Sequence, residues 1–325
     1  MPKNIFDVIT LGSATVDLIL KSSKFKVVKN SSFSTGLALC EIYDSKINIE
    51  DLTLSTGGGA TNTAASLSHF GLNVSCVSFL GDDLFSSVVL EDLKKYKVDT
   101  SNLRILPNKK TALSVILSPR EGGRTVMIHR GACKDLSINS FEKLPKASWA
   151  YITNLGGDFK NVYEVILFLK KMQIKVFWNP GLNEVKNFDV NVLKSVDILS
   201  LNLEEALKLS KLKPENNLKN LLIYFKKFKN LITLITLGSR GAFLISPFEV
   251  LHISSFKVPV TNSLGAGDAF GSGFLFGFIE FKNIKKALEY GIKNAINIIQ
   301  IEPTKGNFLK SINDYPSPKI KLINL

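Results

Sequence analysis

The sequence predicts an α/β protein in which helices cover both faces of a mainly parallel sheet, with a small β lid added. Two observations predict this fold. Short apolar runs with strand character alternate with segments of helical periodicity, which favours parallel strands joined by crossover helices. No proline-, glycine- or serine-rich linker and no repeat interrupts the 325 residues. We therefore expect one domain over residues 1–325, with a lid built from two segments at about 18–56 and 108–132.

The first half of the chain is expected to contribute the first strands and most of the lid. Gly71 follows a segment with helical spacing and marks its end. A glycine-rich turn at 119–123 separates two alternating runs and indicates a hairpin. The predicted strands are 7–12, 37–42, 46–49, 74–79, 112–117 and 125–129, and the predicted helices are 60–70 and 84–95.

From residue 149 onward a regular strand–helix rhythm predicts the rest of the sheet. The predicted buried strands are 150–153, 175–178, 198–201 and 231–237, with helices at 162–172, 204–209 and 217–228. A late antiparallel pair is expected at 243–246 and 250–256. Two helices containing glycine, at about 267–280 and 284–300, then close the fold.

Composition excludes several classes of protein. The three cysteines, Cys40, Cys76 and Cys133, are scattered and form no CxxC pair, so a disulfide framework or zinc site is not expected. The N-terminus lacks the features of a signal peptide, and no apolar run is long enough to span a bilayer, so we expect a cytoplasmic protein. The net charge of +13 comes from lysines spread along the chain, so a nucleic-acid partner is not expected.

The segment Leu264–Gly273 carries the strongest chemical signal. Gly265, Ala266 and Gly267 have almost no side chain, so their backbone N–H groups are free to bind an anion at a helix N-terminus. Asp268 would stand in the same turn and accept a proton from a hydroxyl. The alternative is a turn that only caps the helix.

Residues 260–278 resemble the C-terminal signature of the ribokinase/PfkB carbohydrate kinases, D-T-x-G-A-G-D followed by a helix. The resemblance implies a ribokinase-like three-layer α/β/α fold and transfer of the γ-phosphoryl group of ATP to a hydroxyl. It also implies that Asp268 is the catalytic base and that Gly265, Ala266 and Gly267 form the anion hole.

A second signature of the same family lies at residues 55–65, which resemble its G-G-x-x-x-N segment. The resemblance implies that Gly57, Gly58 and Asn62 bind the sugar. It also makes Asp17, which follows the first strand, a ligand for substrate hydroxyls. The alternative reading is a glycine turn with Asn62 as a local cap and Asp17 as a turn residue.

Two further matches concern the nucleotide. Asn202 and Glu205 fit the family's N-x-x-E, which implies that Glu205 organises Mg²⁺ through water, whereas helix capping is the alternative. The family's strand-end loop, which faces ATP, is matched by Thr236, Gly238 and Gly241. The alternative is a simple tight turn between strands.

The sequence departs from the family pattern at two acids. Asn262 stands where the family has the Asp of D-T-x, which the resemblance assigns to a monovalent-cation site, so activation by K⁺ is in doubt. Asn179 replaces a further Asp. Both changes spare Asp268, and an active enzyme is still expected.

The acceptor is expected to be a neutral ribose-like sugar or a nucleoside, bound together with ATP. Arg124 and Arg130 flank the second lid strand, where they would either meet an anionic group on the substrate or remain surface residues. Two other functions stay open: an inactive ligand-binding homologue of the fold, and a basic nucleic-acid-binding protein. Edge strands of the lid make a homodimer plausible.

Overall fold

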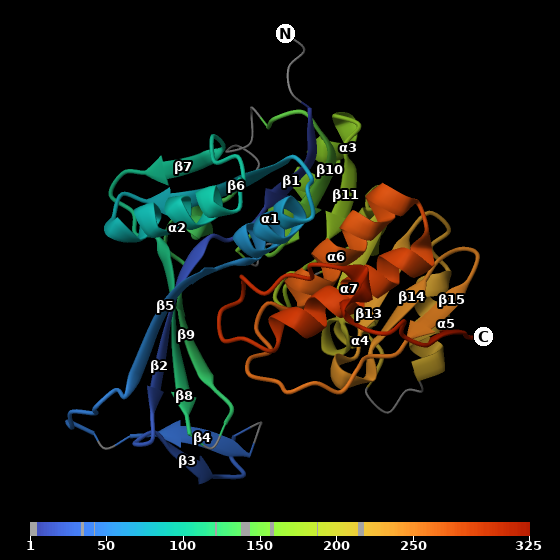
Figure 1. The fold of residues 1–325 in the computed structure, drawn as a ribbon. Coiled ribbons are helices and arrows are strands. Elements are labelled where there is room, and N and C mark those ends of the chain that lie inside the picture. The colour runs from blue at the N-terminus through green and yellow to red at the C-terminus, as the bar shows by residue number, and fades with distance from the viewer. Residues whose placement is uncertain are drawn as a thin grey trace.

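Two sheets define the architecture in Figure 1: a large sheet inside an α/β body, and a four-stranded sheet that projects from the body. The computed structural model describes residues 5–33, 36–41, 43–120, 122–137, 144–156, 159–186, 188–213 and 218–325. The predicted α/β fold with a mainly parallel sheet is confirmed. None of the helices within these ranges is long and apolar enough to cross a bilayer.

The large sheet is parallel over most of its width. Its strands are β1 (Phe6–Leu11), β6 (Val74–Gly81), β7 (Leu103–Leu106), β10 (Ala147–Ile152), β11 (Lys175–Trp178), β12 (Ile198–Asn202), β13 (Ile232–Thr236), β14 (Ala242–Ile245), β15 (Val250–Ile253) and β16 (Ile320–Leu322). Their order is β16-β15-β14-β13-β12-β11-β10-β1-β6-β7, and β14, β15 and β16 run antiparallel to their neighbours. The predicted late antiparallel pair therefore extends one edge of this sheet.

Helices cover both faces of the large sheet because its strands alternate between two apolar cores. Ile9 and Leu11 of β1 pack into one core, and Val8 packs into the other. The first core includes α3 (Phe159–Lys171), α4 (Leu203–Ser210) and α5 (Leu218–Lys226). The second includes α1 (Gly59–His69), α2 (Leu84–Lys95), α6 (Ala266–Phe281) and α7 (Ile284–Ile298). Strands buried on both faces are typical of a parallel sheet.

The four-stranded sheet draws on two distant chain segments. Its strands are β2 (Thr15–Ser22), β5 (Asp51–Gly57), β8 (Ala112–Pro119) and β9 (Thr125–His129), in the order β5-β2-β8-β9. Beyond it, β3 (Lys26–Lys29) pairs with β4 (Leu37–Cys40). Successive side chains point to opposite faces, so Asp17 and Ile116 face the body while Leu18 faces away.

The structure corrects several predicted elements. The strand at 46–49 is wrong: regular pairing starts only at Asp51, opposite Lys21 of β2. The strands β2, β3, β5, β7 and β16 were not predicted. Strands β7 and β16 are short edge strands, and the leucines of β2 and β5 all lie on the outward face of the sheet instead of facing a core. Ile42, Glu121 and Asn217, which fall in predicted elements or turns, lie outside the described residues.

Candidate active site

Three adjoining cavities meet at the N-terminus of α6, and the inner one lies between the body and the four-stranded sheet. The inner cavity, of about 320 Å³, is lined by Asp17, Asn62 and Asp268 and by the inward face of β8 and β9. The middle cavity, of about 260 Å³, shares Asp268 with the inner one. The outer cavity, of about 780 Å³, shares Gly267 and Thr236 with the middle one. The N-terminus of α6 therefore borders all three.

The first turn of α6 presents backbone donors to these cavities. Gly265 is the N-cap residue with φ +75°, a left-handed conformation that favours glycine, and a Cβ there would lie 3.0 Å from Thr304. No side chain among the described residues caps this end of the helix. A Cβ on Gly267 would point into open space. The Ala266 N–H makes a long hydrogen bond to the backbone oxygen of Ser263 at 3.4 Å. The N–H groups of Gly265 and Gly267 have no such backbone partner among the described residues, and these residues line the inner and the middle cavity, as an anion site requires.

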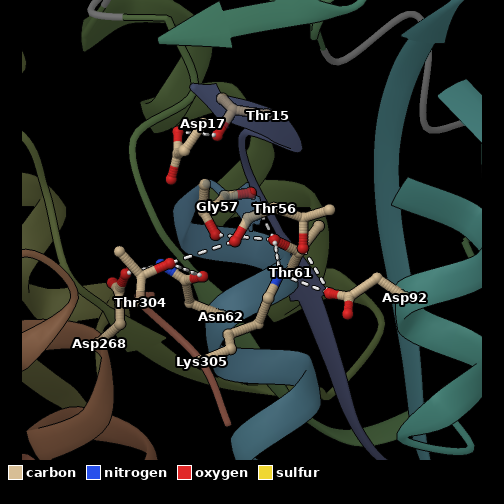
Figure 2. A network of polar contacts seen from close by, with 11 residues as sticks. Thr15, Asp17, Thr56, Gly57, Thr61, Asn62, Asp92, Asp268, Thr304 and Lys305 are labelled. Atoms are coloured by element: carbon tan, nitrogen blue, oxygen red, sulfur yellow. Dashed lines mark hydrogen bonds and ion pairs between the residues drawn. The ribbon is translucent and has the colours of Figure 1, made fainter. Parts of the chain in front are cut away.

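Asp268 and Asn62 meet across the floor of the inner cavity (Figure 2). The amide Nδ2 of Asn62 donates to Oδ2 of Asp268 at 2.8 Å. Burial raises the pKa of Asp268 to about 6, although Asn62 and the Lys305 ammonium both oppose this rise. The carboxyl group is half-buried and reaches both the inner and the middle cavity. It can therefore accept a proton near neutral pH at the boundary between two binding spaces.

A threonine after α7 fixes the orientation of Asn62. Thr304 Oγ1 lies 3.1 Å from Asn62 Oδ1 and 3.2 Å from the backbone oxygen of Thr56. An ionised carboxylate only accepts hydrogen bonds, so the amide nitrogen must face Asp268 and the amide oxygen must face Thr304. The alternative reading of Asn62 as a local helix cap is not what the structure shows, since no side-chain cap is recorded for α1 in the described chain.

Asp17 lies within β2, not in a turn after the first strand. Thr15 Oγ1 lies 3.3 Å from its Oδ1, and burial raises its pKa, while bonds from Ser114 and Thr15 and the charge of Lys305 oppose the rise. Gly57 packs directly on Asp17, because a Cβ at Gly57 would lie 2.0 Å from Oδ2, and it does not line the inner cavity. Gly58, at φ +93°, does line it. Of the two glycines, only Gly58 is placed to meet a ligand.

The loop that is predicted to face the nucleotide lines the outer cavity. Thr236, Gly238 and Gly241 all line it. Gly241 is at φ +92°, and a Cβ there would lie 1.9 Å from the backbone oxygen of Ile253, so glycine is required. The apolar wall of the outer cavity consists of Phe256, Val258, Phe270, Ile292 and Ile296. A planar heterocycle would find both apolar surface and exposed backbone in this cavity.

Asn202 and Glu205 form a complete capping box at α4. Asn202 Oδ1 accepts from the Glu205 N–H at 2.9 Å, and Glu205 Oε2 accepts from the Asn202 N–H at 2.8 Å. The capping reading is therefore correct, yet both residues also line the middle cavity. Burial raises the pKa of Glu205 to about 7.

No group of three or more His, Cys, Asp or Glu side chains within the described ranges is arranged to hold a metal ion. One carboxylate beside a phosphate site still fits Mg²⁺, which is commonly held by one or two carboxylates, water and the substrate's phosphates. Glu205 is such a carboxylate, because it lines the middle cavity together with Gly267 of the α6 turn.

The two arginines have different surroundings. Arg124 donates from Nη1 to Asn262 Oδ1 and from Nη2 to Ser263 Oγ, both at 2.9 Å, so it binds the chain that leads into α6. Arg130 lines the inner cavity. Asn179 donates from Nδ2 to the backbone oxygen of Ser200 at 2.9 Å and lines the middle cavity.

Several residues of the site are not apparent from the sequence. Thr304, Lys305 and Asp92 complete the network in Figure 2, and Ser13 and Asn154 line both the inner and the middle cavity. Thr304 and Lys305 follow the last helix, outside any glycine motif. A single buried lysine cannot be distinguished in a chain with 41 Lys and Arg residues.

The chain is similar to known proteins over most of its length. The family model for pfkB family carbohydrate kinases matches residues 6–304. Deoxyribokinase of Salmonella typhi is 22% identical over 274 residues, which cover 81% of this chain and 88% of the relative. The nucleoside kinase of Methanocaldococcus jannaschii has a similar structure, with a TM-score of 0.75 and 19% identity over 94% of this chain and 95% of that one. Ribokinase of Arabidopsis thaliana, solved with ribose and ATP, has a TM-score of 0.74 and 20% identity over 93% and 95% of the two chains. This chain belongs to the pfkB family of carbohydrate kinases.

Proposed function

We propose that the protein transfers the γ-phosphoryl group of ATP to a hydroxyl of a small sugar or nucleoside, with Asp268 as the general base. One observation carries the proposal: Asp268, bonded to Asn62 at 2.8 Å, stands between the inner and middle cavities in the uncapped first turn of α6. A base for the attacking hydroxyl and donors for the transferred group thus share one turn, as phosphoryl transfer requires.

The reaction balances within this site. The acceptor oxygen attacks the γ-phosphorus and forms a new P–O bond, while the bond from that phosphorus to the bridging oxygen of ADP breaks. The hydroxyl proton passes to Asp268. Backbone N–H groups of Gly265, Ala266 and Gly267 stabilise the negative charge on the phosphoryl oxygens.

The inner cavity is proposed to hold the acceptor. Asp17, Gly58 and Asn62 would bind its hydroxyls, and Gly57 would support Asp17 from behind. The opposite wall is apolar and is formed by Ala112, Ile116, Val126 and Ile128. A neutral ribose-like sugar or a nucleoside has the matching polar and apolar sides. Arg130 would favour an anionic acceptor, which is the less favoured choice.

The middle and outer cavities are proposed to hold ATP. Thr236, Gly238 and Gly241 would contact the nucleoside part, and Asn202 would lie near the phosphates. Glu205 would hold Mg²⁺ through water, and the ion would neutralise charge on the phosphates. Closure of the four-stranded sheet as a lid would exclude water from the acceptor.

Activity is expected without K⁺. Asn262 Nδ2 donates to the backbone oxygen of Glu302 at 2.5 Å, and its Oδ1 accepts from the Leu264 N–H at 2.9 Å. A neutral amide therefore joins the loop before α6 to the loop after α7. This hydrogen-bonded link would hold the two loops together in place of a bound monovalent cation.

The proposal is tested by a coupled ADP-release screen over ribose, fructose, adenosine, cytidine, guanosine and phosphorylated sugars, with and without K⁺. We expect turnover with a neutral ribose-like sugar or a nucleoside, at equal rates with and without K⁺. Ligand binding without any turnover would instead favour an inactive homologue. Strong, salt-dependent retention on DNA without turnover would favour a nucleic-acid-binding protein.

A further inference from the structure

Lys305 is a buried cation beside the proposed catalytic pair. Its side chain is only 3% exposed, and Nζ lies 3.2 Å from Asp92 Oδ2 and donates to Thr61 Oγ1 at 3.1 Å (Figure 2). Burial lowers the pKa of this ammonium, and the Asp92 carboxylate opposes that change most strongly. Asp92 therefore favours the charged form of Lys305 against the effect of burial.

Thr304 and Lys305 together connect three elements to the catalytic pair. Asp92 belongs to α2 and accepts a second hydrogen bond from the hydroxyl of Thr56 in β5. Thr304 contacts the backbone oxygen of Thr56 and the side chain of Asn62 in α1. Anchoring Lys305 through Asp92 thus fixes the neighbouring Thr304, which orients the Asn62 amide towards Asp268.

The charge of Lys305 also acts on both acids of the inner cavity. It opposes the burial that raises the pKa of Asp268 and of Asp17. The other titratable or charged side chains around Asp268 are Asp17, Tyr151, Glu205, Arg130 and Cys133. Among the described residues, Lys305 is the cation whose charge lowers the pKa of Asp268, whereas Arg130 shares the inner cavity with it.

We propose that Lys305, anchored by Asp92, is a positioning residue for the reaction: it keeps Asp268 ionised and holds Thr304 against Asn62. This inference rests on the proposed function, in which Asp268 is the base. The competing explanation is an ion pair that serves stability alone. Buried ion pairs are weak stabilisers compared with apolar packing, so stability is a poor reason to place one here.

The chain offers a matched control in Lys293. Its side chain is 1% exposed and pairs with Glu289 at 2.6 Å, and Nζ also donates to the backbone oxygens of Ile312 and Tyr315. It lines none of the three cavities. Lys293→Met therefore removes an equally buried ion pair away from the proposed base.

The test is the pH dependence of kcat/KM, which reports the pKa values of the free enzyme. We expect Lys305→Met to move the acidic limb upward by about one pH unit, so that activity below the limb falls roughly tenfold. Lys305→Arg should restore the wild-type profile. Lys293→Met should lower Tm and leave the pH dependence of kcat/KM unchanged.

A double variant tests the inference even if Lys305→Met alone does not fold. Asp92→Asn combined with Lys305→Met leaves no unpaired buried charge, and the same upward shift is expected because Asp92 is not among the groups that act on Asp268. An unchanged acidic limb in a folded double variant would overturn the inference. Absence of turnover in the wild-type protein would count against the proposed function itself, so the two failures are distinguishable.

Discussion

At the scale of single residues, burial has two opposing effects on the Asp268 carboxyl group as a base. Burial makes its carboxyl group a better proton acceptor by raising its pKa to about 6, but burial also disfavours the charged form that must accept the proton. Asn62 and Lys305 limit the rise, so the group is mostly ionised at pH 7. Removing the carboxylate should therefore affect both catalysis and stability.

Asp268→Asn is expected to reduce kcat by about 10³-fold, since general-base catalysis typically contributes 10²–10⁴-fold. Steady-state kinetics would measure this loss, and calorimetry should find substrate binding largely retained. Near-normal turnover would remove Asp268 from the role of base. Wild-type kcat/KM should fall as pH drops below about 6, because the base becomes protonated.

The same variant should change stability in a pH-dependent way. A carboxyl group whose pKa is raised by folding destabilises the native state progressively as pH rises from the ordinary value of 3.8 to the raised value of about 6, and has no such effect where it is protonated in both states. After allowance for its partial exposure, the cost at pH 7.5 is about 1–2 kcal/mol. Asp268→Asn should thus raise Tm at pH 7.5 and leave it unchanged near pH 3, where the carboxyl group is protonated in both states.

At the scale of elements, the β8–β9 end of the four-stranded sheet is joined to the loop before α6. Arg124 makes this link through Asn262 and Ser263. A second link joins β2 to the loop after α7, where Lys21 Nζ lies 2.5 Å from Glu302 Oε1. The sheet therefore contacts both loops that flank the α6–α7 pair, so its position and that of the anion turn are coupled.

Arg124→Ala should weaken this coupling. Loss of two charge-assisted hydrogen bonds at an exposed position is expected to raise KM for the acceptor by about five- to tenfold, because the sheet closes less often over the inner cavity. Arg120→Ala in the same exposed turn is the control and should leave KM unchanged. Equal KM values for wild type and Arg124→Ala would contradict a role in closure.

How much of each element can be predicted from the sequence depends on how it is buried. Strands such as β11 and β12 appear as short apolar runs because both of their faces are covered. In β2 and β5, Leu18 and Leu54 lie on the outward face while Asp17 and Ser55 face the body, so their alternation does not indicate a strand that covers an apolar core. The GAGD turn is local and predictable, but Lys305 reaches the site only through tertiary structure.

At the scale of the whole molecule, the outer face of the four-stranded sheet is unusually apolar. Its side chains are Leu18, Leu20, Leu52, Leu54, Val115, Leu117 and Met127. Leu54 is 49% exposed and Met127 is 51% exposed. Contiguous apolar surface of this kind usually marks an interaction site, and a second copy of the same sheet would cover it.

We therefore expect a homodimer joined through these faces. Leu54→Lys should shift the protein to monomers in sedimentation experiments, because a charge would be buried at the contact. Leu84→Lys is the matched control, since Leu84 on α2 is 86% exposed and lies off this face. A wild-type protein that sediments as a monomer at all concentrations would exclude this arrangement.

The contact between Thr304 and Asn62 joins residues 242 positions apart. During translation, Asp17 and Asn62 emerge from the ribosome long before their partners exist. A nascent chain cannot complete the cleft until Thr304 has been translated. A chain that ends before Thr304 is therefore expected to lack the contact that orients Asn62.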